Sequence, residues 1–380
     1  MRSTRLALIA AGMGLTLAVS ACGANSDNSN SGSGSGSSDT ASSSGGGIPV
    51  GVILPETASS ARWEGFDKPM LKAALEAEGL NPHIENAQGD VQKFSTLADG
   101  MINDGVKVLI IASINSEIGG TVAQKANAQG IPTIDYDRLN LGGSSSFYVS
   151  FDNVKVGELQ GQGMIDALKD KPKGSQIIEI EGAPTDNNAT LFHNGQENKL
   201  KPLYENGTFK LVQSQPIDNW DNQKGGTTFE QIFTSNNSRV DGVVAANDGL
   251  AGAIITVLKK YQLNGKVPVT GQDATADGLK AILTGDQYMT VFKPIKQEAE
   301  ATAKLAAALA KGSAGKADAD KIATDKENDP VGKRDVPSVL LEPKLITKNE
   351  VKQVIDQGYV KAEEVCTGEL QSVCTQLGIS

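Results

Sequence analysis

Short runs of Val, Ile and Leu recur along the chain from about residue 48 and are separated by longer amphipathic stretches. The runs show little alternation of apolar and polar residues, which is typical of strands that are covered on both faces. Strands are expected at Ile48–Leu54, Val106–Ser113, Ile131–Tyr136, Ser175–Glu181, Val240–Ala245, Val267–Gly271 and Met289–Phe292.

The stretches between these runs carry apolar residues at helical spacing, and several of them end at glycine, a common helix stop. Strand and helix therefore alternate over the folded length, which predicts an α/β fold of parallel sheets with helices on both faces. The strands suffice for two doubly wound lobes with a ligand cleft between them. Helices are expected at Phe66–Glu78, Gln92–Asp104, Thr121–Gln129, Val154–Leu168, Asn188–Tyr204, Thr227–Phe233 and Gly249–Tyr261.

The length after residue 47 suits two lobes of ordinary size. The first lobe is expected to hold residues 48–150 plus about 290–340, and the second 151–289 plus about 341–365. Residues 366–380 would form a C-terminal tail. Asp318–Asp335 is rich in Asp and Lys but lacks the spacing of a calcium loop, so we interpret it as a solvated connection.

The first 21 residues have the pattern of a targeting signal. Arg2 and Arg5 precede an apolar run, Leu6–Val19, that is short for a membrane span. The run ends in Val-Ser-Ala-Cys, which resembles a bacterial lipobox and implies cleavage before Cys22 and lipidation of that residue. An ordinary signal peptide with a chance cysteine is the alternative.

Residues 22–47 are nearly all Ser, Gly, Asn and Asp after Cys22, so they predict a flexible tether of roughly 25–30 Å. The chain carries a net charge of −10, and loss of the leader would remove two arginines and no acid. Such an acidic protein is a poor partner for nucleic acid or an anionic membrane surface. Cys366 and Cys374 lie close together in an exported chain and predict a disulfide, with two free thiols as the alternative.

Polar residues follow most of the predicted strands. In open parallel sheets ligands bind outside the carboxyl ends of the strands, so these side chains are expected to share one cleft. The alternative for Asp and Asn is that each caps the next helix. The residues after the strands include Arg62, Trp63, Asp137, Arg138, Asn188, Asn247, Asp273 and Lys293.

Carboxylates and amides accept hydrogen bonds, guanidinium and ammonium groups donate them, and aromatic rings cover C–H faces, so this set suits a sugar. Trp220 joins the set because it stands in a polar stretch, Ile217–Asn222, although a core tryptophan is the common role. Neither His83 nor His193 has a partner at a catalytic spacing, and a phosphate-binding loop motif is missing. We therefore expect no catalytic residue, cofactor or metal.

Several segments taken in order resemble the D-xylose-binding proteins of bacterial ABC importers, within the type I periplasmic sugar-binding family. The resemblance spans about Ile48 to Gly358. It is carried by Ala61–Trp63, Tyr136–Leu139, Phe151–Gln160, Asp186–Ala189, Ala246–Asp248, Gly271–Ala274 and Met289–Ile295.

The resemblance implies a monomeric receptor outside the cytoplasm that passes a monosaccharide to a permease and, through it, an ATPase. It also implies sugar contacts at the strand-end residues, with Trp220 against the ring and Trp63 as a second candidate. Residues 59–63 and Lys107–Ile114 are similar to the broad-range aldose receptor of plant-associated bacteria as well, so several aldoses remain open as ligands. A sugar-responsive transcription regulator or a secreted carbohydrate enzyme fits less well, and a role in chemotaxis stays open.

Overall fold

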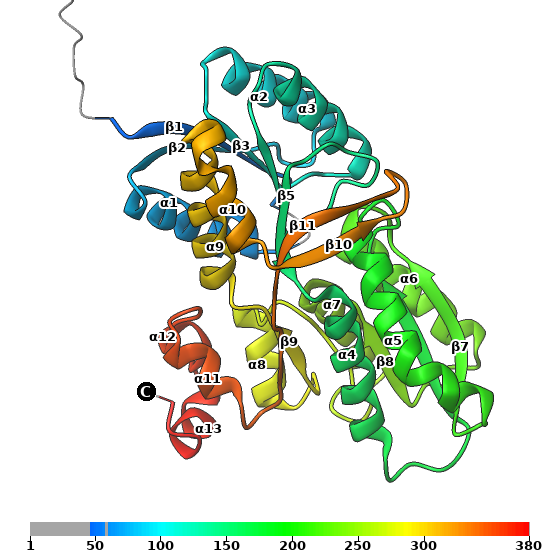
Figure 1. Cartoon of the computed structure of the whole chain (residues 1–380). Helices are drawn as coiled ribbons and strands as arrows, with labels where there is room; N and C mark the ends of the chain where they lie inside the picture. Colours follow the sequence, from blue (N-terminus) through cyan, green and yellow to red (C-terminus); the bar gives the residue numbers. More distant parts are fainter. Residues whose placement is uncertain (1–45, 58–59, 380) are drawn as a thin grey trace, which may run out of the picture. The chain divides into compact units, whose positions relative to one another are not determined.

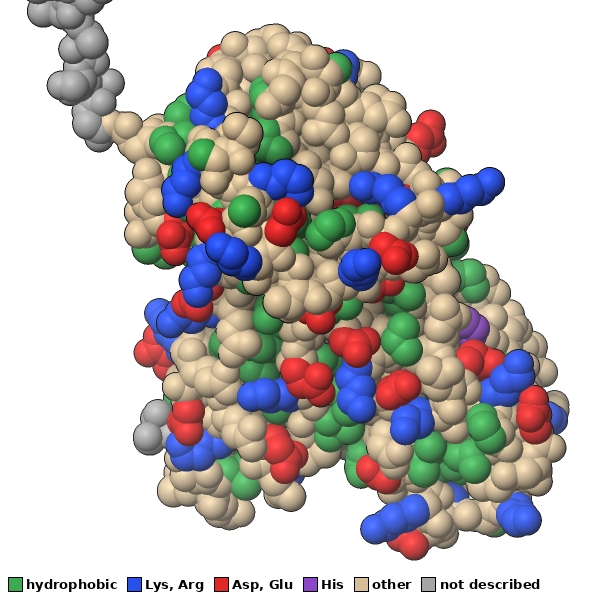
Figure 2. All heavy atoms as spheres, viewed as in Figure 1, with side chains coloured by type: hydrophobic (Ala, Val, Ile, Leu, Met, Phe, Trp, Pro, Cys, Tyr) green, Lys and Arg blue, Asp and Glu red, His purple; other side chains and the backbone are tan. Residues whose placement is uncertain are grey.

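The computed structural model describes residues 46–57 and 60–379, which belong to one compact unit. The leader, Cys22, the tether up to residue 45 and Ser59 lie outside the described residues. Within the described ranges, no helix is both long enough and apolar enough to cross a bilayer. In Figure 2, basic and acidic side chains are interspersed over the visible face.

A seven-stranded sheet forms the first lobe (Figure 1). Its neighbouring strands are parallel, except that β10 pairs antiparallel with β11. The order across the sheet is β10 (Asp325–Asp329), β11 (Arg334–Leu341), β5 (Phe147–Phe151), β4 (Thr133–Tyr136), β3 (Val108–Ile111), β1 (Ile48–Leu54) and β2 (Leu80–Asn86).

Helices cover both faces of this sheet because its central strands are apolar on both sides. Val50 and Val52 of β1 share a core with α1 (Lys68–Ala77) and α9 (Ile295–Leu309). Ile53, which points to the opposite face, packs in a second core with α2 (Val91–Asn103) and α3 (Ser116–Ala128). Two separate cores thus sandwich the sheet, as expected for a doubly wound lobe.

The second lobe is built on a three-stranded parallel sheet, β7 (Phe209–Pro216), β6 (Ser175–Glu181) and β8 (Gly242–Ala245). A bridge from Val243 to Val269 and further backbone hydrogen bonds continue it to β9 (Thr290–Phe292), which pairs antiparallel with β12 (Lys344–Ile346). The strand expected at Val267–Gly271 is therefore reduced to a single bridge. The helices of this lobe are α4 (Asn153–Leu168), α5 (Asn187–Glu205), α6 (Asn222–Ser235), α7 (Asp248–Lys260) and α8 (Ala276–Thr284).

Two mostly parallel sheets flanked by helices confirm the predicted fold class. The chain passes from β5 of the first sheet to α4 of the second lobe, returns from β9 to α9, and passes again from β11 to β12. These crossings place the loops after β4 and β9 next to the loops after β6 and β8. The position of the site follows from this topology.

The interpretation of Asp318–Asp335 as a solvated connection is correct in that most of the stretch is exposed, but wrong in that the stretch has regular structure. This stretch contains the end of α10 (Lys316–Ile322), strand β10 and the turn into β11. Its Asp329 is fully buried and accepts backbone hydrogen bonds from Gly142 at 2.9 Å and Gly332 at 2.8 Å. The acidic residue that suggested solvent exposure instead fixes a turn at the sheet edge.

The C-terminal segment packs on the second lobe. Cys366 and Cys374 form a disulfide, and Cys374 lies at the start of the last turn of α13 (Leu370–Gln376). Cys374 and Ile379 are buried in a core shared with α8 and with α11 (Val351–Asp356). The segment also includes α12 (Ala362–Val365), and it is held by apolar contacts as well as by the covalent link.

Candidate ligand-binding site

A small polar pocket of about 30 Å³ lies where the strand ends of both lobes meet. That volume has room for only a few water molecules. Every residue expected from the strand ends lines it, together with Trp220 from the short helix η2 (Asp218–Trp220). The lining is Ser60, Arg62, Trp63, Asp137, Arg138, Asp186, Asn188, Phe192, Trp220, Asn247, Gln272, Asp273 and Lys293.

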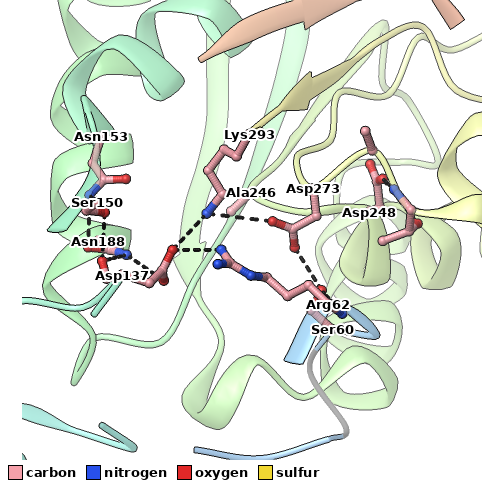
Figure 3. A network of polar contacts seen from close by, with 12 residues as sticks. Ser60, Arg62, Asp137, Ser150, Asn153, Asn188, Ala246, Asp248, Asp273 and Lys293 are labelled. Atoms are coloured by element: carbon pink, nitrogen blue, oxygen red, sulfur yellow. Dashed lines mark hydrogen bonds and ion pairs between the residues drawn. The ribbon is translucent and has the colours of Figure 1, made fainter. Parts of the chain in front are cut away.

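Asp137 occupies the centre of the polar network (Figure 3). It follows β4 with a positive φ of 61°, a conformation that costs a non-glycine residue energy and turns the chain sharply at the strand end. Its carboxylate accepts hydrogen bonds from Arg62 Nη1 at 2.7 Å, Lys293 Nζ at 3.3 Å and Asn188 Nδ2 at 3.2 Å. One first-lobe carboxylate thus contacts groups from three other segments.

The charge state of Asp137 follows from these contacts. Burial alone would raise its pKa, but the positive charges of Arg62, Lys293 and Arg138 outweigh that effect and hold the pKa well below its usual range. The carboxylate is therefore ionised at all physiological pH values. An ionised carboxylate is a strong, fixed acceptor for hydroxyl donors.

Arg62 is anchored from behind by two acids that the sequence analysis missed. Its Nε and Nη2 donate to both oxygens of Asp67 at 2.9 and 2.7 Å, and Nη2 also donates to Glu298 at 3.1 Å. Asp67 ends the short helix η1 (Trp63–Asp67), and Tyr136 donates a 2.7 Å hydrogen bond to it. Despite burial, these acids and Asp137 raise the pKa of Arg62 further, so its guanidinium is a permanent, oriented donor.

Asp186 links Arg138 and Trp220 from the second lobe. Its Oδ1 caps α5 through the Asn188 backbone N–H at 3.0 Å, while Oδ2 accepts from Arg138 Nε at 3.0 Å and Trp220 Nε1 at 3.1 Å. The capping role and the site role therefore coexist in one side chain. Asp186 belonged to a recognised motif, yet only the fold shows that it holds two residues of the pocket.

Asp273 and Lys293 close the other side of the pocket. Asp273 has a φ of 98° and accepts a 2.9 Å hydrogen bond from Ser60 Oγ of the first lobe. Lys293 Nζ lies 3.7 Å from Asp273 and 3.3 Å from Asp137, so it is placed between the two carboxylates (Figure 3). This lysine follows β9 directly, at a crossing between the lobes.

The two asparagines differ in how much of their side chain is already used. Asn247 Oδ1 caps α7 by accepting from the Leu250 N–H at 2.9 Å, so the capping alternative is correct for its oxygen. Asn188 donates to the Asp137 backbone carbonyl at 2.9 Å and accepts from Asn153 at 3.0 Å. Within the described residues the Asn247 amide nitrogen makes no hydrogen bond, whereas both ends of Asn188 are engaged.

Both tryptophans are buried at the pocket. The guanidinium carbons of Arg62 and Arg138 lie 4.6 and 5.1 Å from the ring centre of Trp63, which fits cation–π contact. Trp220 meets Phe192 edge-on, with ring centres 6.4 Å apart. A Cβ atom at Gly182 would lie 2.1 Å from the Trp220 ring, so glycine is required for the ring to pass there.

Comparison with known proteins now bears on this arrangement. A periplasmic binding protein domain matches residues 50–314. The chain belongs to the periplasmic binding protein family. It is 38% identical over 305 residues to the D-xylose-binding periplasmic protein of Escherichia coli strain K12, a match covering 80% of this chain and 88% of that protein. The resemblance expected from the motifs is thereby confirmed.

Two further members of this family broaden the comparison. The multiple sugar-binding periplasmic receptor ChvE of Rhizobium radiobacter is 33% identical over 332 residues, covering 83% of this chain and 92% of that protein. An ABC transporter solute-binding protein of Clostridium phytofermentans, solved with bound β-D-glucose, is 29% identical with a TM-score of 0.75, covering 83% of this chain and 99% of that one.

Proposed function

We propose that this protein is the solute receptor of an ABC importer and that it binds one monosaccharide, preferentially D-xylose, in the pocket between its lobes. One observation carries the proposal. Asp137, Asp273 and Asp186 alternate with Lys293, Arg62 and Arg138 around a single small space. Sugar hydroxyls both donate and accept hydrogen bonds. They can therefore bind the acidic and the basic partner of each of these ion pairs.

Specific roles follow for the lining residues. Asp137 and Asp273 would accept from hydroxyls, while Arg62, Arg138 and Lys293 would donate. The amides of Asn188 and Asn247 would complete the polar contacts. Trp220 would lie against the apolar face of the ring, with Trp63 behind the two guanidinium groups. No member of this set is proposed to perform covalent chemistry, so the protein is proposed to bind and not to catalyse.

Binding would be coupled to a change in the distance between the lobes. Ser60 and Arg138 of the first lobe contact Asp273 and Asp186 of the second, and the pocket is too small for a free sugar to enter. The cleft must therefore open to load. A sugar that bonds to both lobes favours the closed form, and that closed surface would be recognised by the permease.

Among monosaccharides, we propose a pentose over a hexose as the ligand. D-xylose lacks the exocyclic hydroxymethyl group of glucose and galactose, so it needs less room beyond the ring. The similarity to D-xylose-binding proteins of Escherichia coli and Haemophilus influenzae supports the same choice. The alternative is a broad aldose receptor, supported by the similarity to the multiple sugar-binding receptor.

The proposed location is the outer side of the cytoplasmic membrane, with Cys22 as the lipidated residue and residues 23–47 as the tether. The support is the sequence pattern around Cys22, together with the periplasmic proteins in the same family. Replacing Cys22 by alanine should release the protein into the soluble fraction or block its processing. Unchanged membrane fractionation of Cys22→Ala would contradict the anchor.

Calorimetric titration of the purified protein with D-xylose, D-glucose and L-arabinose tests the function. A clear preference for xylose is expected, with one site per chain. Equal affinity for the hexose would replace the xylose proposal by the broad aldose receptor. Failure to bind any aldose of a wider panel would overturn the receptor function itself.

A further inference from the structure

Three side chains with metal-ligand chemistry gather in the second lobe, outside the pocket described above. Glu179 and Glu181 are alternate residues of β6, so both point to the same face of the sheet. His193 lies in the second turn of α5, which packs on that face. One ligand atom from each residue falls within 4.8 Å of the other two. We call Glu179, Glu181 and His193 the acidic cluster.

The carboxylates of the acidic cluster are buried but poorly satisfied. Glu181 is 5% exposed, and among the described residues neither of its oxygens has a donor in good hydrogen-bond geometry, although His193 and Gln196 lie beside it. Glu179 is fully buried. Its Oε1 accepts from Tyr204 at 2.6 Å, while Oε2 has no donor in good hydrogen-bond geometry within the described part of the chain, although Ser214 lies nearby. Buried polar atoms of this kind are rare in folded proteins, and an unseen ion is one recognised explanation.

Charge in this region is unbalanced. Among the ion pairs of the described residues, Glu181 meets the His193 imidazole at 3.5 Å, and neither glutamate meets a lysine or arginine. Burial accordingly raises the pKa of Glu179 to about 7 and also raises that of Glu181. The two acids lie side by side without a permanent cation, so a bound cation would relieve both the repulsion and the missing contacts.

The acidic cluster is reachable from solvent. A depression of about 260 Å³ is lined by Glu181, Thr190, His193 and Ser214, among others. The His193 side chain is 38% exposed and forms part of its wall. An ion can therefore enter from this side, and water can complete its coordination.

We propose that Glu179, Glu181 and His193 bind one divalent transition-metal ion of the zinc class. Zinc accepts a mixed set of imidazole nitrogen and carboxylate oxygen at about 2.0–2.2 Å, which places ligand atoms about 3–3.6 Å apart. The observed spread of 4.8 Å closes to that range with small side-chain shifts. Calcium and magnesium need six or more oxygens, so a site with three protein ligands that include an imidazole disfavours them.

This inference is independent of the sugar pocket. From this part of the chain the pocket takes Asp186, Asn188 and Phe192, which lie in the turn after β6 and at the start of α5. The acidic cluster takes Glu179 and Glu181 from β6 and His193, the residue after Phe192, from α5. None of the three residues lines the sugar pocket. Loss of metal binding should therefore leave the sugar affinity unchanged.

The test is calorimetric titration of the untagged, chelator-treated protein with zinc chloride, with calcium chloride and magnesium chloride as comparisons. The wild type should bind one zinc ion per chain and gain thermal stability with zinc concentration. His193→Ala and Glu181→Gln should each weaken zinc binding at least about tenfold. His83→Ala is the matched control, because His83 also stands beside a carboxylate, Glu85 at 3.4 Å, but on an open surface.

The outcomes separate a site from adventitious binding. Equal zinc affinity in the wild type, His193→Ala and Glu181→Gln would overturn the proposal, as would loss of the site in His83→Ala. Tighter binding of calcium than of zinc would overturn the assigned ion class. Glu181→Gln should fold at least as well as the wild type without metal, because it removes a buried charge, so lost zinc binding in that variant cannot be ascribed to misfolding. Retained sugar binding in both variants would show this independently.

Discussion

The sugar pocket and the acidic cluster are both buried groups of charged side chains, but their carboxylates differ in the partners that compensate their charge. In the pocket, each carboxylate meets a cation, and Asp137 alone contacts Arg62 and Lys293. In the acidic cluster, two carboxylates share one half-exposed imidazole. The pKa of Asp137 is lowered, whereas that of Glu179 is raised to about 7. Both carboxylates are buried, and the pKa of Asp137 is lowered because three cations, Arg62, Lys293 and Arg138, together outweigh its burial.

The largest effect should come from removing a cation from the pocket. Arg62→Met leaves Asp67 and Glu298 buried without their positive partner, so the free energy of unfolding should fall by about 3–5 kcal/mol. Urea unfolding measures this change. Arg239→Met, at an exposed position, should stay within about 0.5 kcal/mol of the wild type. If the free energy of unfolding falls no more in Arg62→Met than in the control, then Arg62 does not stabilise the buried Asp67 and Glu298.

The second effect concerns pH and separates the two regions. A raised carboxyl pKa means that the folded state holds the proton more tightly, so Glu179 should lower stability as pH rises from about 4.5 through about 7. The loss at pH 8 is of the order of 3 kcal/mol. Asp137 behaves oppositely: its stabilisation is fully present above the ordinary carboxyl pKa and is lost progressively as pH falls from there towards its lowered pKa.

Glu179→Gln should therefore flatten the stability profile between pH 5 and 8, measured by urea unfolding in the presence of a chelator. Asp135 and Asp248, whose pKa values burial raises to about 6 and about 7, remain in both proteins, so the comparison is the difference between them. Glu85→Gln, at a surface position, is the control. Parallel profiles for Glu179→Gln and the wild type would mean that Glu179 does not titrate in this range.

The third effect is on affinity. Arg138→Ala removes a donor from the pocket and leaves Asp186 with Trp220 as its one side-chain donor among the described residues. Sugar binding should therefore weaken about tenfold to a hundredfold. Asp273→Ala should act similarly, because Ser60 and Lys293 lose their shared acceptor. His193→Ala should leave sugar affinity unchanged. Calorimetric titration with D-xylose measures the affinity of each of the three variants. An equal loss of affinity in His193→Ala would show that the acidic cluster and the pocket are not independent.

The smallest effect should come from Trp220→Phe. The ring is largely kept, but the hydrogen bond from Nε1 to Asp186 is lost, which costs about 1 kcal/mol or roughly a fivefold loss of affinity. Trp220→Ala should cost more, since the apolar contact with Phe192 and the sugar face disappears as well. An equal effect of the two substitutions would assign the whole contribution to the hydrogen bond.

Strand ends were readable from the sequence because the apolar runs are strong and each is followed at once by a polar residue. Asp137, Asp273 and Lys293 were found in this way, and the pocket brings them together. Glu298 carried no such signal. It lies within the alanine-rich helix α9, and only the packing of that helix beside η1 places it against Arg62.

The acidic cluster shows a second limit of the sequence. In the sequence His193 has no partner at a catalytic spacing, and the low alternation expected of the apolar runs does not describe β6. Glu179 and Glu181 break that pattern in a period of two. The strands β10 and β12 were missed for a different reason. The residues of β10 are polar, although it pairs with the next strand along the chain, β11, whereas β12 is only 3 residues long and pairs with the distant β9.

The polar side chains of the pocket form hydrogen bonds and ion pairs with one another, so they compete with the ligand for the same partners. In the proposed binding mode, each contact such as that of Lys293 with Asp137 or of Ser60 with Asp273 would be exchanged for a contact to the sugar. The affinity would then be a difference between two nearly matched sets of bonds. A ligand that lacks one hydroxyl would leave either one internal contact unbroken or one charged side chain without a partner. Discrimination against incomplete ligands is therefore built into the resting arrangement, and loosening one internal pair would relax selectivity before it abolished binding.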